Sequence, residues 1–353
     1  MQTLQPRSHD DTLRPGQFTA RFTPRRLPRI NSPFVRDVLA GLSRPQKEIP
    51  STWLYDRRGC ELFEAITRLD AYYPTRTESA ILERCAAQIA AAAGPGATLV
   101  ELGSVAGCKP PMLLAALDAP NAYVSVDVSA DGMAESMAAL QTLFPKLPMH
   151  TIVGDIADPA TLAPLRRSVG ALARASRSAR PWGRRLGFCP SSTIGNFAPD
   201  VAAALLDRIG QALGDDAMLV VGVDATLDRS VVLPAYDDRA GVTAAFNKNL
   251  LVRINRELEG DFDPAAFRHE ARFDAPRQRV EMHLVSKTWE TFEVMGRRVS
   301  FPAGESIHTM DSYKYSLTRF QALAQRSGWT PIQFWTDARA HFGVHVLERS
   351  RVA

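Results

Sequence analysis

The sequence predicts an α/β fold in which helices cover a mainly parallel sheet. The first observation is a strand, a turn and a helix in direct succession: the apolar run 98–102 meets Gly103, and a Pro-opened segment follows at 110–117. The second is that further apolar runs alternate with helical patterns, and the third is a final helix followed by two strand-like runs. The expected strands are 98–102, 122–129, 149–156, a run from 185, 216–224, 329–337 and 340–349.

The turn after the first strand is where such a sheet would hold a nucleotide-like cofactor. Gly103 and Gly107 let the backbone approach a ligand closely, and the carboxyl ends of the strands border the crevice. Glu101, just before the turn, suits hydroxyl or ammonium groups better than phosphates. Taken alone the pattern is weak, since glycine and serine are ordinary residues of strand-to-helix turns.

Acidic residues end the next two expected strands. Asp127, about two dozen residues after the glycine turn, offers the acceptor that ribose hydroxyls require. Its alternative role is to cap the next helix, for which Ser129 is an equally good residue. Asp155 could accept from an adenine amino group or be a simple turn residue.

Composition is that of a soluble globular protein. Hydrophobic residues make up 45% and charged residues 23% of the chain. No apolar run reaches membrane-spanning length, and the N-terminus lacks the apolar region of a secretory signal. The four cysteines are widely separated and form no CxxC pair. We therefore expect a reduced, cytoplasmic protein without a membrane partner, and a monomer.

A basic segment at 166–185 accounts for the positive charge of the chain. It holds seven arginines and no acid, and without these arginines the net charge of +4 becomes −3. A solvated loop is favoured over a patch that docks an acidic partner. Because the segment lacks interleaved aromatics and the chain lacks a nucleic-acid-binding motif, we expect no nucleic acid partner.

Two stretches do not fit the alternating core and predict a second lobe. Residues 1–76 (with 1–30 lacking a sustained pattern) include a Ser32-capped helix, and 225–313 is an insertion of helices and strands. We expect these pieces to combine over the carboxyl ends of the strands of a core made of 77–224 and 314–353. His341 and His345 are expected to be strand residues rather than metal ligands, and no metal site is predicted.

An ordered set of motifs carries a resemblance to a known family. The motifs are WLYDRRGCELFEAITRLDAYYPTR, ELGS, VDVS, GDI, SSTIGNF, AYDDRAGVTAAFNKNLLVRINRELEGDFD, RVEMHL, FPAGESIHT and SYKYS. Between Leu42 and Leu347 the chain resembles the histidine-specific Nα-methyltransferases of ergothioneine biosynthesis. The resemblance implies a class I methyltransferase core, Rossmann-like with a seven-stranded sheet, plus a substrate-binding lobe. It also implies methyl transfer from S-adenosylmethionine to the α-amino group of an amino acid.

The resemblance gives roles to individual residues. Those on cofactor-contacting positions are Gly103, Lys109, Asp127, Asp155 and Ile156, with Tyr55 and Phe63 lining the region between the two ligands. Those on substrate positions are Tyr72, Asn196 and Tyr236 for the amino and carboxylate groups, and Met282, Met310 and Ser312 around the side chain. Asn196 and Tyr236 are the predicted catalytic pair, since amide and phenol oxygens accept hydrogen bonds from an amine.

Departures from the family pattern lie in the same two regions. Val105 stands where the family has glycine, Pro110 and Pro111 where it has Thr-Arg, and Ser191 where it has another glycine. Met310 stands where a family glutamate accepts hydrogen bonds from imidazole, and methionine makes an apolar, adaptable wall instead. We therefore hypothesise that the clamp for the amino-acid backbone is kept while the side-chain pocket is not tuned for histidine.

Two functions follow from these observations. The first is an amino-acid N-methyltransferase whose substrate is histidine, another amino acid such as tryptophan, or an amino-acid-like molecule. The second, prompted by the altered turn, is a catalytically weakened homologue that binds a ligand or partner in a regulatory or assembly role. Binding of S-adenosylmethionine discriminates between them.

Overall fold

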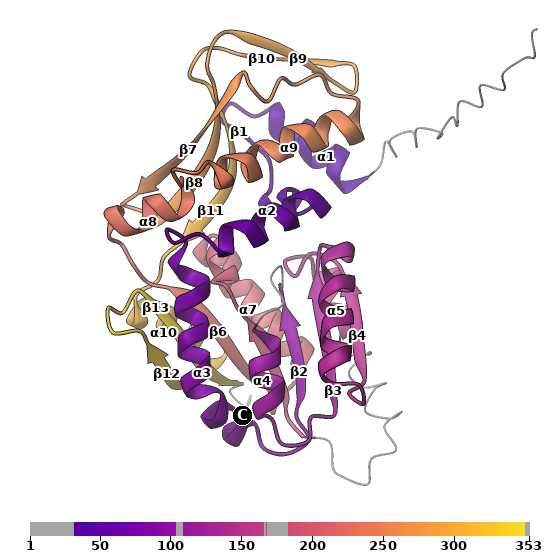
Figure 1. The fold of residues 1–353 in the computed structure, drawn as a ribbon, viewed down its shortest axis with the longest axis vertical. Helices are drawn as coiled ribbons and strands as arrows, with labels where there is room; N and C mark the ends of the chain where they lie inside the picture. Colours follow the sequence, from indigo (N-terminus) through magenta and orange to yellow (C-terminus); the bar gives the residue numbers. More distant parts are fainter. Residues whose placement is uncertain (1–31, 104–108, 166, 168–182, 350–353) are drawn as a thin grey trace, which may run out of the picture.

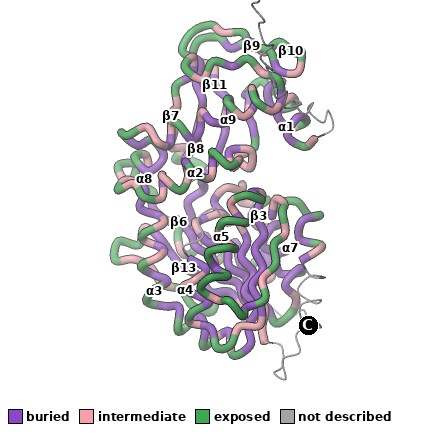
Figure 2. Tube along the Cα trace, turned by 45° about the vertical axis from the view of Figure 1, so that its right-hand side comes forward, coloured by how far each residue is buried: buried purple, intermediate pink, exposed green. Residues whose placement is uncertain are grey.

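A computed structural model describes residues 32–103, 109–165, 167 and 183–349. Figure 1 shows two stacked bodies, a large sheet flanked by helices and, above it, a smaller sheet with helices of its own. The buried residues lie in the central strands and on the inner helix faces of both bodies, as the tube in Figure 2 shows. Val105, Gly107 and nearly all of the arginine-rich segment lie outside the described residues.

The large sheet of the described chain has seven strands. They are β2 (Thr98–Leu102), β3 (Ala122–Asp127), β4 (Met149–Val153), β5 (Arg185–Cys189), β6 (Met218–Asp224), β12 (Trp329–Thr336) and β13 (Phe342–Arg349). Their spatial order is β12-β13-β6-β5-β2-β3-β4. β13 is antiparallel to both of its neighbours, and the other pairs are parallel. One reversed strand at this place in the order is the topology of class I methyltransferases, which confirms the predicted fold.

Helices cover both faces of this sheet, because its strands are apolar on both sides. They are α3 (Tyr73–Ala93), α4 (Pro110–Ala116), α5 (Ala130–Leu143), α7 (Pro199–Leu213) and α10 (Leu317–Arg326). Leu99 packs in the cluster that contains α3 and α4, whereas its neighbours Val100 and Leu102 pack in the cluster of α7 and α10. None of the described helices combines the length and apolarity that crossing a bilayer requires.

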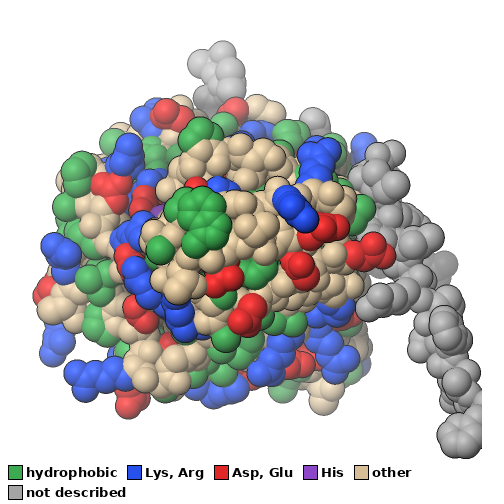
Figure 3. All heavy atoms as spheres, turned by 90° about the horizontal axis from the view of Figure 1, so that it is seen from above, with side chains coloured by type: hydrophobic (Ala, Val, Ile, Leu, Met, Phe, Trp, Pro, Cys, Tyr) green, Lys and Arg blue, Asp and Glu red, His purple; other side chains and the backbone are tan. Residues whose placement is uncertain are grey.

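The upper body joins segments from distant parts of the chain. Its strands are β1 (Lys47–Glu48), β7 (Phe267–Asp274), β8 (Arg279–Ser286) and β11 (Ser306–Tyr313), in the order β1-β11-β8-β7, beside the hairpin of β9 (Glu290–Val294) and β10 (Arg297–Phe301). Its helices are α1 (Pro33–Leu42), η1 (Ser51–Leu54), α2 (Arg57–Thr67), α8 (Arg229–Tyr236) and α9 (Val242–Leu258). Because β1 pairs in parallel with β11, the N-terminal segment and the insertion share one sheet. Seen from above in Figure 3, acidic and basic side chains are interspersed over this body.

Details of three elements add to or differ from the expected pattern. Helix α3 begins at Tyr73 with Pro74 in its first turn, a position where proline suits a helix. The expected lobe boundary between residues 76 and 77 falls within α3, which packs on α4 and β13. β13 begins at Phe342, so His345 is a strand residue and His341 precedes the strand. β7, with the sequence FRHEARFD, was not anticipated because charged residues obscure its alternation.

Asp56 caps α2 and ties it to α9. Its Oδ1 accepts from the Gly59 N–H at 2.8 Å and from the Asn249 amide at 2.7 Å, and its Oδ2 is 2.6 Å from Arg256 Nη2. Burial alone would raise the pKa of Asp56, but the hydrogen bonds from Arg256, Gly59 and Asn249 outweigh it and lower the pKa below its usual value. We expect Asp56→Ala to lower the free energy of unfolding by about 1–2 kcal/mol, measured by urea denaturation at pH 7.

Asp56→Asn isolates the charge, since asparagine still caps the helix. A lowered pKa in the folded protein stabilises it above the unfolded pKa, about 3.9, and this contribution is lost as the pH falls through the folded value. The stability difference between wild type and Asp56→Asn should therefore be present at pH 7 and disappear in acid. A difference that does not change with pH would contradict this role of the carboxylate.

Candidate functional site

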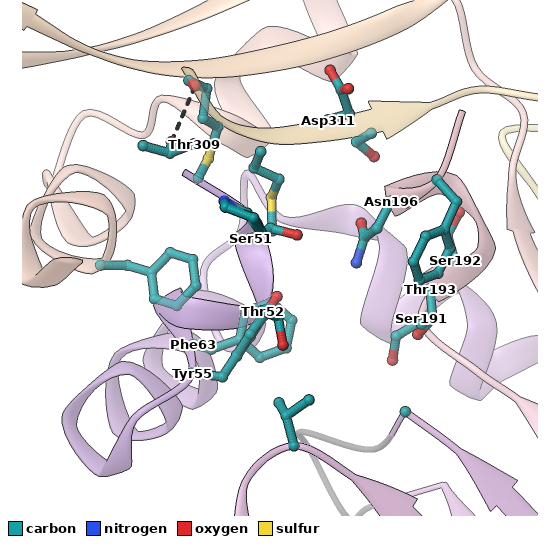
Figure 4. Close-up of a pocket in the computed structure, with 18 of the residues that line it drawn as sticks. Ser51, Thr52, Tyr55, Phe63, Ser191, Ser192, Thr193, Asn196, Thr309 and Asp311 are labelled. Atoms are coloured by element: carbon teal, nitrogen blue, oxygen red, sulfur yellow. Dashed lines mark hydrogen bonds between the residues drawn. The ribbon is translucent and has the colours of Figure 1, made fainter. Parts of the chain in front are cut away.

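A cavity of about 530 Å³ lies where the carboxyl ends of the large sheet meet the upper body. Its volume is within the range of small-molecule sites. Figure 4 shows side chains from both bodies around it, with the Asn196 carboxamide directed into the open space. The predicted site residues in its wall are Tyr55, Phe63, Tyr72, Gly103, Asp127, Asp155, Ile156, Asn196, Tyr236, Met282, Met310 and Ser312.

Gly103 and Asp127 form the strand-end part of the wall, where a cofactor is expected. Gly103 has φ +79°, and a Cβ placed there would lie 2.9 Å from Thr193 Cγ2. The turn therefore requires glycine, both for its backbone conformation and for space. Asp127 ends β3, and its Oδ1 accepts from the Ser129 N–H at 2.8 Å. The cap of α5 is Ser129, whose hydroxyl accepts from the Gly132 N–H, so Asp127 is not needed as the cap.

Asp155 and Ile156 continue this wall after β4. Asp155 has the turn role, since its Oδ1 accepts from the Ala157 N–H at 2.8 Å, and the residue also borders the cavity. Glu101 was expected to offer its carboxylate near the turn. It instead accepts a hydrogen bond from the buried Tyr123 hydroxyl within the sheet, and it is not among the residues of the cavity wall.

Lys109, a predicted cofactor contact, is not among the described residues of the cavity wall. Its ammonium forms a buried ion pair with Glu78 of α3, and it donates to Ser191 Oγ at 2.7 Å. Ser191 has φ +62°, a left-handed conformation that favours the glycine expected there. The serine hydroxyl provides Lys109 with an acceptor that glycine would lack. Pro110 and Pro111 begin α4, at positions where proline suits a helix.

A chain of aromatic rings forms the wall between the two bodies. Tyr55 and Phe63 have ring centroids 5.7 Å apart, Phe63 and Tyr72 6.1 Å, and Tyr72 and Tyr236 6.4 Å. Burial and then the neighbouring Tyr236 raise the pKa of Tyr72 well above its usual value. Burial and then the Asp127 carboxylate do the same for the pKa of Tyr55. Both phenols therefore remain protonated at neutral pH and can donate hydrogen bonds.

A buried polar network supports the Tyr236 hydroxyl, and its charged members were not identified from the sequence. Lys314 Nζ is 2.6 Å from Asp224 Oδ2 and donates to the hydroxyls of Tyr236 and Ser312, at 2.9 Å each. These two hydroxyls are 2.7 Å apart, and the Tyr73 hydroxyl donates to Asp224 at 2.7 Å. Two sequence features could have pointed to this network: the lysine of the SYKYS motif and the aspartate that ends β6. The network therefore holds the hydroxyls of Tyr236 and Ser312, two predicted substrate-binding residues, in position.

Met282 and Met310 are cross-strand neighbours that face the cavity together. The pairing of β8 and β11 shifts by one residue between His308 and Met310. A one-residue shift changes the face on which a side chain lies, so the bulge at Thr309 sets Met310 beside Met282. The Thr309 hydroxyl donates to the Met282 carbonyl at 3.0 Å and holds the bulge (dashed line in Figure 4).

The chain is similar to known methyltransferases over nearly its whole described length. The family described as "Histidine-specific methyltransferase, SAM-dependent" matches residues 34–349. Histidine N-alpha-methyltransferase of Mycolicibacterium smegmatis is 38% identical over 89% of this chain and 94% of that protein. The enzyme of the same name from Mycobacterium tuberculosis is 37% identical with the same coverage. Ergothioneine biosynthesis protein 1 of Neurospora crassa is 28% identical over 90% of this chain and 35% of that protein.

These similarities agree with the strand order and with a cavity at the carboxyl ends of the strands. The glycine turn and the strand-end aspartates fit an S-adenosylmethionine cofactor, because Gly103, Asp127 and Asp155 all border the cavity at the carboxyl ends of the strands. Given the family match and the identity to the mycobacterial enzymes, the chain belongs to the histidine-specific, S-adenosylmethionine-dependent methyltransferases.

Proposed function

We propose that the protein methylates the α-amino group of an amino acid and that the residues of the cavity wall divide between the two ligands. The observation that carries this proposal is the meeting of Gly103, Asp127 and Asp155 with Asn196 and Tyr236 around one cavity. S-adenosylmethionine supplies an activated methyl group, so the protein needs no nucleophile of its own. Its task is to bind and orient an amine in its neutral form.

Asn196 and Tyr236 are the proposed orienting residues. The Asn196 carboxamide oxygen is an acceptor for an amine hydrogen. Because Lys314 donates to both Tyr236 and Ser312, and one of these hydroxyls donates to the other, one hydroxyl hydrogen remains for a ligand. A substrate carboxylate oxygen is a suitable acceptor for it. A nearby sulfonium charge lowers the pKa of the substrate ammonium, which can then lose its proton to water.

The side-chain pocket is proposed to favour an apolar or aromatic amino acid over histidine. Met282 and Met310 are 1% and 8% exposed, and neither supplies a strong acceptor for an imidazole N–H. Flexible thioethers fill space around aromatic groups well. We further propose that 1–76 with 225–313 form the substrate-binding lobe and that 77–224 with 314–353 form the methyltransferase core. We also propose a monomeric, cytoplasmic protein without membrane or nucleic acid partners.

Two measurements test this function. Calorimetry with S-adenosylmethionine should show one binding site per chain, and the absence of binding at millimolar cofactor would contradict methyl transfer and favour the weakened homologue. A panel of the common amino acids, assayed by mass for one, two or three added methyl groups, should identify the substrate. If histidine is trimethylated far better than all others, the inference from Met310 is wrong while methyl transfer stands.

Tyr236→Phe should affect amino-acid binding selectively. The ring stays, and the lost hydroxyl hydrogen bond to a charged group is worth about 1.5–3 kcal/mol, so kcat/KM should fall about tenfold to a hundredfold. The affinity for S-adenosylmethionine, measured by calorimetry, should be unchanged. Tyr55→Phe is the matched control, because Tyr55 stands beside Asp127 on the proposed cofactor side. A parallel loss of cofactor affinity in Tyr236→Phe would contradict its place on the substrate side.

A further inference from the structure

Two histidines and two carboxylates lie together on the polar face of the smaller sheet. On the antiparallel strands β8 and β11, His283 stands opposite His308 and Glu281 opposite Asp311. Glu281 and His283 alternate with Met282 along β8, so they lie on the other face of that strand. The bulge at Thr309 is what brings Asp311, rather than Met310, opposite Glu281.

The donor atoms of three of these residues converge. One ligand atom from each of Glu281, His283 and His308 lies within 4.8 Å of the others. His283 Nε2 is 3.1 Å from Glu281 Oε2, and His308 Nε2 is 3.1 Å from Asp311 Oδ1. Two ligands at about 2.05 Å from one tetrahedral ion would be roughly 3.3 Å apart, so binding would draw Glu281, His283 and His308 together from within 4.8 Å, with Asp311 reaching the ion from beside His308.

Neighbouring side chains fix the orientation of these donors. His283 Nδ1 is 3.1 Å from Ser306 Oγ, which suits a ring that donates from Nδ1 and binds through Nε2. Arg279 contacts Glu281 Oε1 and, at 2.9 Å, Asp311 Oδ2. The guanidinium therefore holds the outer oxygen of each carboxylate, while the other oxygen of each faces a histidine. It also offsets part of the negative charge.

We propose that Glu281, His283 and His308, with Asp311 as a fourth ligand, bind a divalent transition-metal ion of the zinc class. Imidazole nitrogen and carboxylate oxygen are suitable ligands for such an ion, and four protein ligands make a closed, structural site. A bound ion would replace the hydrogen bonds between the histidines and the carboxylates. Binding displaces the protons held between these groups, in the usual linkage of metal binding to proton release.

The position of the site connects it to the cavity. His308 and Asp311 flank the bulge, and both also border the cavity that contains Met310. The side chains of Glu281 and His308 are each 17% exposed, so an ion can reach them. A bound ion would join β8 to β11 on both sides of the bulge and so hold Met310 in place. Sequence spacing does not reveal the site, because its ligands come from two strands and depend on the bulge.

Calorimetry of the full chain, freed of metal by a chelator, tests the proposal with Zn²⁺ as the probe. We expect one equivalent per chain and an affinity at least about tenfold lower in His308→Ala and in Glu281→Gln. His150→Ala is the matched control, since His150 is exposed on β4 in the other body, and its affinity should equal that of the wild type. Circular dichroism of each variant checks that it is folded.

A second probe is independent of affinity. Co²⁺ bound by two imidazoles and carboxylates in a tetrahedral site gives a characteristic visible absorption, which His308→Ala should abolish and His150→Ala should leave intact. Absence of saturable Zn²⁺ binding overturns the proposal. So does binding that is equally strong in the wild type and in a folded His308→Ala or Glu281→Gln protein. The readouts do not depend on methyl transfer, so their outcome is separate from that of the proposed function.

Discussion

Lys314→Met is expected to lower the free energy of unfolding by about 3–5 kcal/mol, because it leaves the Asp224 carboxylate buried without a cation. Both side chains of this pair are 0% exposed, and their charged atoms are 2.6 Å apart. Burial alone would lower the pKa of Lys314, but the Asp224 carboxylate outweighs it and raises the pKa. The lysine is therefore charged in the folded protein, and the variant retains only neutral donors around the carboxylate.

The urea concentration at the midpoint of unfolding measures this effect. Tyr73→Phe is the matched control, since it removes one hydrogen bond to Asp224 and keeps the ion pair, at a cost of about 1 kcal/mol. A Lys314→Met, Asp224→Leu double variant removes both charges and should recover much of the lost stability. If the double variant is no more stable than Lys314→Met alone, the unpaired carboxylate is not the cause of the loss.

Lys314→Met also tests whether this buried network supports binding of the amino acid. Lys314 donates hydrogen bonds to the hydroxyls of Tyr236 and Ser312 and so fixes their positions. Variants that still fold at low temperature should therefore show a higher KM for the amino acid than the wild type. Cofactor affinity should change little, because the cavity-lining residues at the ends of β2, β3 and β4 are not part of this network.

The sequence was sufficient for the sheet and for the part of the cavity wall at the ends of its strands. Residues at the carboxyl ends of parallel strands converge at one edge, so Gly103, Asp127 and Asp155 could be placed together from the strand pattern alone. Asn196, Tyr236 and Met310 could be assigned to the site only from the resemblance to a family. They lie in three separate segments, and the local spacing of residues does not show that these segments meet.

Other features depend on tertiary contacts that no periodicity encodes. Lys109 is paired with Glu78 of α3, and it is not among the described residues of the cavity wall. The bulge at Thr309 is a matter of register between strands, and a regular strand would have put Met310 on the other face. Charged residues hide β7 because its partly exposed face is polar.

Met310→Glu is expected to shift substrate preference toward histidine. Met310 is 8% exposed, so a carboxylate introduced there is largely desolvated and requires a donor. The imidazole N–H of a bound histidine supplies one, and a hydrogen bond to a charged acceptor is worth about 1.5–3 kcal/mol. An apolar side chain leaves the carboxylate unpaired, so that substrate also loses affinity. Both effects act in the same direction on the ratio of specificity constants.

The ratio of kcat/KM for histidine to that for the best apolar amino acid should rise by about tenfold to a hundredfold in Met310→Glu. Met310→Leu is the matched control, because it keeps the wall apolar and should leave the ratio nearly unchanged. Both substitutions alter the volume of the side chain at position 310, but only Met310→Glu makes it polar. Comparing them therefore separates the effect of polarity from the effect of shape. An equal ratio in wild type and Met310→Glu would mean that the substrate side chain does not reach the Met282 and Met310 wall, and the specificity inferred from that wall would then be wrong.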